Sequence, residues 1–165
     1  ERLQRVIVQG QVVQSGERSL RGAQMTVSRA IAAAGGQTQM AGQEIEIQRV
    51  VDGRSVIIPV TRAQLDGGDD PQLMADDVVN VKTGRVFFVT GEVNAGGQKV
   101  WAPGMTVGKA ISMSNGMTNK GKLGHIKRQI KGADGKIRFE KITKLKDETE
   151  ILPEDTLVID RKWFG

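Results

Sequence analysis

Residues 85–118 read RVFFVTGEVNAGGQKVWAPGMTVGKAISMSNGMT, and residues 5–38 read RVIVQGQVVQSGERSLRGAQMTVSRAIAAAGGQT. Both stretches contain, in the same order, an apolar strand, a glycine turn, a second short strand and a Met-Thr-Val sequence that starts a helical pattern. A supersecondary unit that recurs along a chain indicates a duplicated structure. We therefore divide the chain into two tandem units, residues 1–83 and residues 84–165.

The alignment of the two units pairs residues of the same expected role: Gly10 with Gly91, Thr26 with Thr106, Gly36 with Gly116, and Arg49 with Arg128. A glycine inside a strand usually marks a bulge or the close approach of another backbone. We therefore expect Gly10 and Gly91 to lie in equivalent surroundings.

Each unit is predicted to run strand, strand, helix, strand, strand, strand. The later strands are expected over residues 44–51, 55–60 and 77–81 in the first unit, and over 126–130, 136–142 and 155–160 in the second. Thr26 and Thr106 are the expected N-caps of the helices, and a loop is expected at residues 66–68. One helix over a small mixed sheet predicts an α+β fold of two tandem β-grasp (ubiquitin-like) domains.

Charge is unevenly distributed along the chain. Residues 1–84 carry 9 basic and 10 acidic side chains, whereas residues 85–165 carry 15 basic and 9 acidic ones. Most of the excess lies between residues 120 and 146, where a basic surface would attract phosphates, anionic polymers or acidic lipid head groups. A merely solvated basic face is an equally weighted alternative.

The sequence offers little for catalysis or metal binding. It has no cysteine and a single histidine, His125, so the usual zinc ligand sets and a catalytic triad are out of reach. The acidic pairs at residues 69–70 and 76–77 are interpreted as turn and strand-entry residues, because adjacent strand residues point to opposite faces. Residues 91–97 lack the glycine spacing of a phosphate loop. We expect no catalytic residue, no metal and no cofactor.

The motifs of the second unit resemble a known family, the SLBB (soluble-ligand-binding β-grasp) domains of bacterial polysaccharide export proteins of the Wza-type outer-membrane auxiliary family. The family pattern is similar to V-x-G-E-V, then P-G-x-T-(V/L), A-I and finally L-x-P-G-D. This chain has VTGEV at 89–93, PGMTV at 103–107, Ala110-Ile111 and LPED at 152–155, with AGG at 34–36 in the first unit. Trp163-Phe164 resembles the aromatic pair that often closes the last such domain. The chain departs from the pattern at Asn94-Ala95-Gly96-Gly97, and at Asp76 and Glu154, where the glycine of P-G-D is lost.

The resemblance implies a non-enzymatic periplasmic module, attached to the outer membrane in the full-length protein, that contacts or lines the path of a secreted capsule or exopolysaccharide. It implies as partners the polysaccharide, bound weakly through many contacts, sister subunits in a ring, and an inner-membrane polysaccharide co-polymerase or outer-membrane component. The candidate glycan- or anion-binding residues are Trp101, Lys120, Lys122, Lys127, Arg128 and Lys131. The residues expected to maintain the fold are Gly10, Gly36, Gly91, Gly104, Thr26, Thr106 and Gly116.

Three alternatives stay open at this point. Trp101 either stacks on a sugar or packs in the core or between domains. The whole chain is either a glycan-contacting module or a purely structural oligomerisation and spacer module between export components. Nucleic-acid binding through the basic half is disfavoured, because the chain has only two Trp and four Phe and no RNP-like strand or helix-turn-helix signature.

Overall fold

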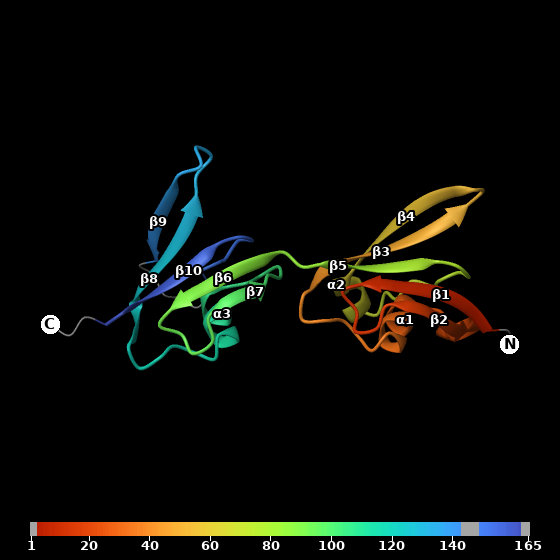
Figure 1. The fold of residues 1–165 in the computed structure, drawn as a ribbon, viewed down its shortest axis with the longest axis horizontal. Coiled ribbons are helices and arrows are strands. Elements are labelled where there is room, and N and C mark those ends of the chain that lie inside the picture. The colour runs from red at the N-terminus through yellow and green to blue at the C-terminus, as the bar shows by residue number, and fades with distance from the viewer. Residues whose placement is uncertain (1–2, 143–148, 163–165) are drawn as a thin grey trace. The chain divides into compact units, whose positions relative to one another are not determined.

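The computed structural model describes residues 3–142 and 149–162, and the chain divides into two compact units, Glu1–Gly84 and Arg85–Gly165 (Figure 1). Each unit has its own hydrophobic core and its own five-stranded mixed sheet. The predicted α+β class is confirmed. Within the described residues, no helix has the length and apolar character that crossing a bilayer requires.

The first unit contains β1 (Leu3–Gly10), β2 (Gly16–Arg21), the 3-10 helix η1 (Gly22–Gln24), α1 (Val27–Ala33), β3 (Ala41–Val51), β4 (Arg54–Thr61), α2 (Arg62–Asp66) and β5 (Val78–Thr83). The strand order across the sheet is β2-β1-β5-β3-β4. The central pair, β1 and β5, is parallel, and the other pairs are antiparallel.

The second unit contains β6 (Val86–Gly91), β7 (Gly97–Val100), α3 (Val107–Met113), β8 (Gly121–Lys131), β9 (Ile137–Ile142) and β10 (Thr156–Arg161). Its strand order, β7-β6-β10-β8-β9, repeats that of the first unit strand for strand, including the parallel central pair β6 and β10. In each unit, the hairpin formed by the third and fourth strands projects from the body of that unit (Figure 1).

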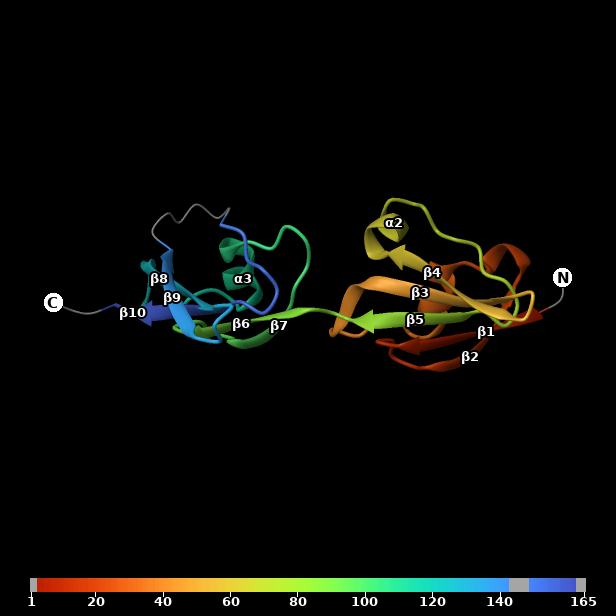
Figure 2. The same cartoon turned by 90° about the horizontal axis from the view of Figure 1, so that it is seen from above.

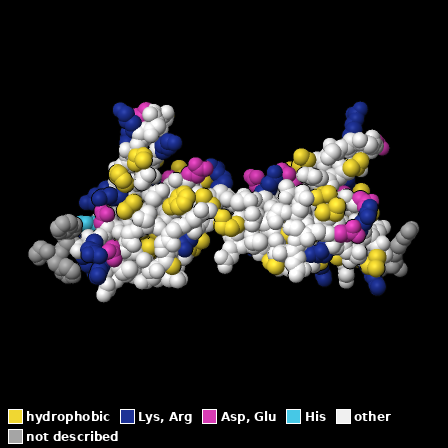
Figure 3. Space-filling model, in the orientation of Figure 1, with side chains coloured by type: hydrophobic (Ala, Val, Ile, Leu, Met, Phe, Trp, Pro, Cys, Tyr) yellow, Lys and Arg dark blue, Asp and Glu magenta, His cyan; other side chains and the backbone are white. Residues whose placement is uncertain are grey.

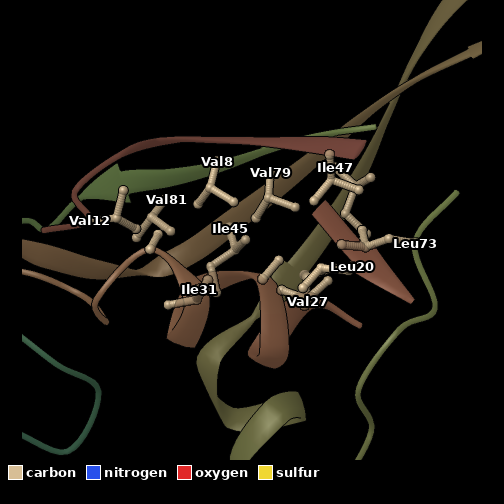
Figure 4. Close-up of a cluster of buried hydrophobic side chains, with 14 of the residues drawn as sticks. Val8, Val12, Leu20, Val27, Ile31, Ile45, Ile47, Leu73, Val79 and Val81 are labelled. Carbon is tan, nitrogen blue, oxygen red and sulfur yellow. The ribbon is translucent and has the colours of Figure 1, made fainter. Parts of the chain in front are cut away.

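The core of each unit lies between the sheet and its main helix. In the first unit, alternate residues of the central strands, such as Val8 and Val79, face Val27 and Ile31 of α1, and all four are buried (Figure 4). Because strand side chains alternate between faces, the intervening residues lie on the opposite side of the sheet. We call that side the helix-free face.

Gly10 and Gly91 occupy equivalent places, as predicted. Both have a left-handed backbone, with φ of +84° and +91°. A Cβ atom at Gly10 would lie 2.2 Å from the carbonyl oxygen of Val81, and one at Gly91 would lie 2.1 Å from that of Ile159. Only glycine permits this approach between the first and last strands of each unit.

Both main helices begin at the predicted threonines. The hydroxyl of Thr106 accepts a hydrogen bond from the backbone N–H of Lys109 (3.3 Å), as expected of an N-cap. Thr26 is also the N-cap residue, as predicted, but its hydroxyl accepts no capping hydrogen bond. There, the carboxylate of Asp70 accepts from the backbone N–H of Ser28 (3.0 Å) and takes over the capping role.

Two further predictions need correction. The loop predicted at residues 66–68 begins as a helix, because α2 follows β4 directly and runs to Asp66 (Figure 2). The alignment of Arg49 with Arg128 is also wrong. Gln48 pairs with the first residue of β5 and Gln129 with the first residue of β10, so Ile130 is the counterpart of Arg49. The cause is one additional residue in β8 before its first buried isoleucine.

Candidate functional site

The structure does not gather the predicted basic residues into one site. Lys127 and Arg128 are adjacent on β8 and therefore lie on opposite faces of the sheet. Lys127, on the helix-free face, forms an ion pair with Asp160 (2.6 Å). Arg128, on the other face, contacts Glu140 (2.8 Å) and Asp155 (3.5 Å). The hydrogen bond that Arg128 donates to Glu140, together with the nearby carboxylate of Asp155, raises the pKa of Arg128.

The remaining predicted lysines are far apart along β8. Lys120 precedes the strand and Lys122 lies near its start, whereas Lys131 is its last residue. Lys131 lies nine positions after Lys122 along the strand, roughly 30 Å at the usual rise per residue. Lys120 and Lys122 are both exposed and are two positions apart in the sequence.

Trp101 is part of the core of the second unit. Its Nε1 donates a hydrogen bond to the carbonyl oxygen of Ile151 (2.7 Å), and its ring packs against the buried cluster that includes Leu157. The half-buried indole therefore fits the packing alternative. Trp163-Phe164, the other aromatic feature noted in the sequence, lies outside the described residues.

A buried aspartate organises the turn before the last strand of each unit. Asp77 is 1% exposed and accepts from the backbone N–H of Met74 (2.8 Å) and from Nη2 of Arg49 (2.7 Å). Asp155 accepts in the same way from the backbone N–H of Leu152 (2.8 Å). The sequence indicates the turn but not the buried ion pair.

The residues before these aspartates adopt a backbone conformation that is usually found at glycine. Asp76 and Glu154 have φ of +67° and +69°, in the left-handed region that glycine occupies at little cost. These are the two positions at which the chain departs from the L-x-P-G-D pattern.

A polar residue ties the first and last strands to the segment after the main helix in each unit. In the second unit, Glu92 accepts from the hydroxyl of Thr118 (2.6 Å) and from Nε of Arg161 (3.0 Å). These two hydrogen bonds lower the pKa of Glu92. In the first unit, Gln11 occupies the equivalent place and accepts from the hydroxyl of Thr38 (2.6 Å).

A cavity of about 400 Å³ opens beside α1 and α2 in the first unit. Its polar lining consists of Ser28, Gln37, Thr38, Arg62 and Asp66, and its apolar lining includes Ile31, Ala32 and Leu65. Nη1 of Arg62 donates to the side-chain oxygen of Gln37 (2.6 Å), so the guanidinium is held at the wall. A volume of this size, with an apolar part and several polar groups, is usual for a small-molecule site.

An acidic group stands next to this cavity. The hydroxyl and backbone N–H of Ser28 both donate to Asp70. Burial of Asp70 opposes its ionisation, but hydrogen bonds, chiefly those from Ser28, together outweigh this effect and lower the pKa of the carboxyl group. Ser28 of the cavity lining is therefore hydrogen-bonded to a carboxylate held in its charged form.

His125 lies half-buried in β8. Within residues 3–142 and 149–162, no three or more His, Cys, Asp or Glu side chains are placed to hold a metal ion. The geometry thus defines a duplicated α+β scaffold with a polar cavity on its first unit. No protein-family model and no curated protein sequence matches this chain.

Proposed function

We propose that this chain is a tandem pair of SLBB β-grasp domains from a bacterial polysaccharide export protein of the Wza-type auxiliary family. It acts in the periplasm, is attached to the outer membrane in the full-length protein, and contacts the secreted glycan without catalysing a reaction. The strand order of each sheet and its single main helix support the β-grasp assignment.

One observation carries the family assignment. At the positions where the family pattern has glycine, Asp76 and Glu154 keep the left-handed backbone that glycine adopts. The aspartates that follow them, Asp77 and Asp155, make the same turn-closing hydrogen bond in both units. The local structure that the P-G-D pattern encodes is thus present twice, although its glycine is not.

The glycan contact is best placed at the cavity of the first unit. Its hydroxyl, amide, guanidinium and carboxylate groups match the donors and acceptors of a sugar, and its apolar lining suits the faces of a sugar ring. The exposed pair Lys120 and Lys122 adds a second, weaker contact for an acidic polymer. Weak, separated contacts suit a polymer that has to keep moving.

Isotope-labelled protein titrated with oligosaccharides tests this proposal by NMR, with alginate oligomers as the anionic probe and dextran oligomers as the neutral one. Saturable shifts are expected at the amides of Ser28, Gln37 and Thr38 with at least one probe. Arg62→Ala should weaken them, and Arg54→Ala, an exposed arginine on β4 away from the cavity lining, should not. Shifts absent with both probes, or equally affected by both variants, would contradict a glycan site in the cavity.

A second role, in assembly, is favoured by the exposed apolar residues of the projecting hairpins. The partners in this role are sister subunits in a ring and an inner-membrane co-polymerase or outer-membrane component. The surface concerned is distinct from the cavity, because it lies on the helix-free face.

A further inference from the structure

The helix-free face of each sheet carries a row of side chains that crosses all five strands. In the first unit, the strand pairing places in one row Glu17, Ile7, Val78, Gln48 and Ile57. In the second unit, the equivalent row consists of Gln98, Phe88, Thr156, Gln129 and Phe139. Position by position, Ile7 corresponds to Phe88 and Ile57 to Phe139.

These corresponding apolar residues are exposed to the same degree. Ile7 and Phe88 are each 38% exposed, and Ile57 and Phe139 are 57% and 61% exposed. The solvent-facing side of an antiparallel sheet is normally polar, and single exposed apolar residues need no explanation. Two equivalent positions that are apolar and exposed in both units indicate a surface used for contact.

The apolar surface continues toward the tip of each projecting hairpin. We call β3–β4 the first arm and β8–β9 the second arm. The next pair on the same face is Val50 with Ser55 in the first arm and Lys131 with Ile137 in the second. Val50 is 73% exposed and Ile137 is 59% exposed. Apolar side chains are visible on both arms in Figure 3.

The two arms carry opposite charge on this face. The first arm has Glu44 and Glu46 there, and the second arm has Lys127, Lys131 and Lys141. An ion pair between the third and last strands of each unit has its acidic and basic partners exchanged between the units. Glu46 of β3 pairs with Lys82 of β5 (2.9 Å), whereas Lys127 of β8 pairs with Asp160 of β10 (2.6 Å).

We propose that the helix-free face of the first unit in one copy packs against the helix-free face of the second unit in another copy. This inference deepens the assembly role proposed above and rests on it. Joining unlike faces buries both apolar rows between an arm that carries acidic side chains and an arm that carries basic ones. Joining like faces brings like charges together, which disfavours that pairing.

Packing through faces also agrees with the edges of the sheets. β4 is the edge strand of the first arm, and Pro59 in its middle has no backbone N–H to offer a strand from another chain. A contact between two different surfaces is heterologous, so repeated association builds rings or filaments. The wild-type chain is therefore expected to form larger assemblies as concentration rises.

Complementation between two variants tests the proposal. Ile57→Ser disables the helix-free face of the first unit, and Phe139→Ser disables that of the second. Sedimentation velocity should therefore find each variant alone monomeric up to about 1 mM, a concentration at the weak end of specific association. An equimolar mixture should form a dimer through the two intact surfaces. Each substitution should weaken wild-type association on the order of tenfold or more. Val56→Ser and Ile130→Ser, on the other face of the same arms, should leave it unchanged.

Other outcomes would overturn the proposal in distinguishable ways. If the wild-type protein is still monomeric at about 1 mM, a concentration that matches the Kd of a very weak complex, the proposed interface does not exist. Dimers formed by one variant alone indicate contact between like faces. Equal loss in the Val56→Ser and Ile130→Ser controls assigns the effect to folding. The oligosaccharide titration is read separately, so the glycan role stands or falls without this result.

Discussion

Alanine at Gly10 or Gly91 is expected to disrupt the central strand pair of the corresponding unit. The added Cβ would lie 2.2 Å from the carbonyl oxygen of Val81 or 2.1 Å from that of Ile159. These oxygens belong to the backbone of the neighbouring strand, so no side-chain rotation relieves the overlap. The strands must separate, and the adjacent hydrogen bond from the N–H of Gln11 to the carbonyl of Val81 (2.9 Å) weakens with them.

The magnitude follows from two contributions. A left-handed backbone costs a non-glycine residue about 1–2 kcal/mol. Separation of a buried strand pair adds to this, and the total of roughly 3–5 kcal/mol lies at the upper end of single-substitution effects. A unit of about 80 residues is ordinarily stable by about 4–12 kcal/mol, so either variant is expected to lose a large part of the stability of one unit.

Gly36 and Gly116 supply the matched controls. Their φ values are +88° and +79°, but nothing lies within 4 Å of a Cβ built on either. Alanine there should cost only the backbone contribution, about 1–2 kcal/mol. Urea unfolding followed by circular dichroism reports on both units, and tryptophan fluorescence reports on the second, since both tryptophans follow residue 84. Equal losses for Gly10→Ala and Gly36→Ala would refute the close-approach argument.

Three further substitutions are expected to act on the second unit. Glu154→Gly should raise its stability by roughly 0.5–1 kcal/mol, because the left-handed backbone penalises glutamate more than glycine loses in chain entropy; an unchanged or lower urea midpoint would contradict this. Glu92, whose folded-state pKa is lowered below 4.5 by hydrogen bonds from a hydroxyl and a guanidinium, stabilises the fold above that value and loses this contribution as pH falls through the folded pKa. Thermal melts at decreasing pH should therefore fall less steeply for Glu92→Gln, and identical pH profiles would count against the assignment. Trp101→Leu should cost about 1–2 kcal/mol, since the carbonyl of Ile151 loses its donor, while leaving the oligosaccharide shifts unchanged; weaker shifts at unchanged stability would indicate stacking instead.

The sequence predicts the duplication, the fold class and most elements correctly, for local reasons. Alternating apolar residues place β3, β4 and β9 within a few residues of their ends. Gly35-Gly36 and Asn115-Gly116, all with positive φ, follow the ends of the helices. These signals depend on neighbours in the chain. The sequence alignment of Arg49 with Arg128 is wrong because an additional residue in β8 shifts the strand register. No residue type in the sequence indicates where that additional residue lies.

The candidate site is less predictable than the fold. Closeness in sequence predicts one basic group, yet adjacent strand residues such as Lys127 and Arg128 belong to different faces. Helix α2, which forms one wall of the cavity, is not among the predicted elements, although Thr61 and Gln64 form a capping box that T-x-x-Q spacing can indicate. The cavity itself combines segments about 30 residues apart, and no local pattern predicts their contact.

The most direct test of the account is a set of NOEs between backbone atoms of the first and last strands of each unit. The duplicated fold predicts cross-peaks from Gly10 to Val81 and from Gly91 to Ile159, the two parallel contacts that only glycine permits. Finding both in one sample supports the same arrangement twice in one chain. A cross-peak from Gly10 to Ile159 would contradict this arrangement. So would a missing cross-peak between Gly10 and Val81 or between Gly91 and Ile159.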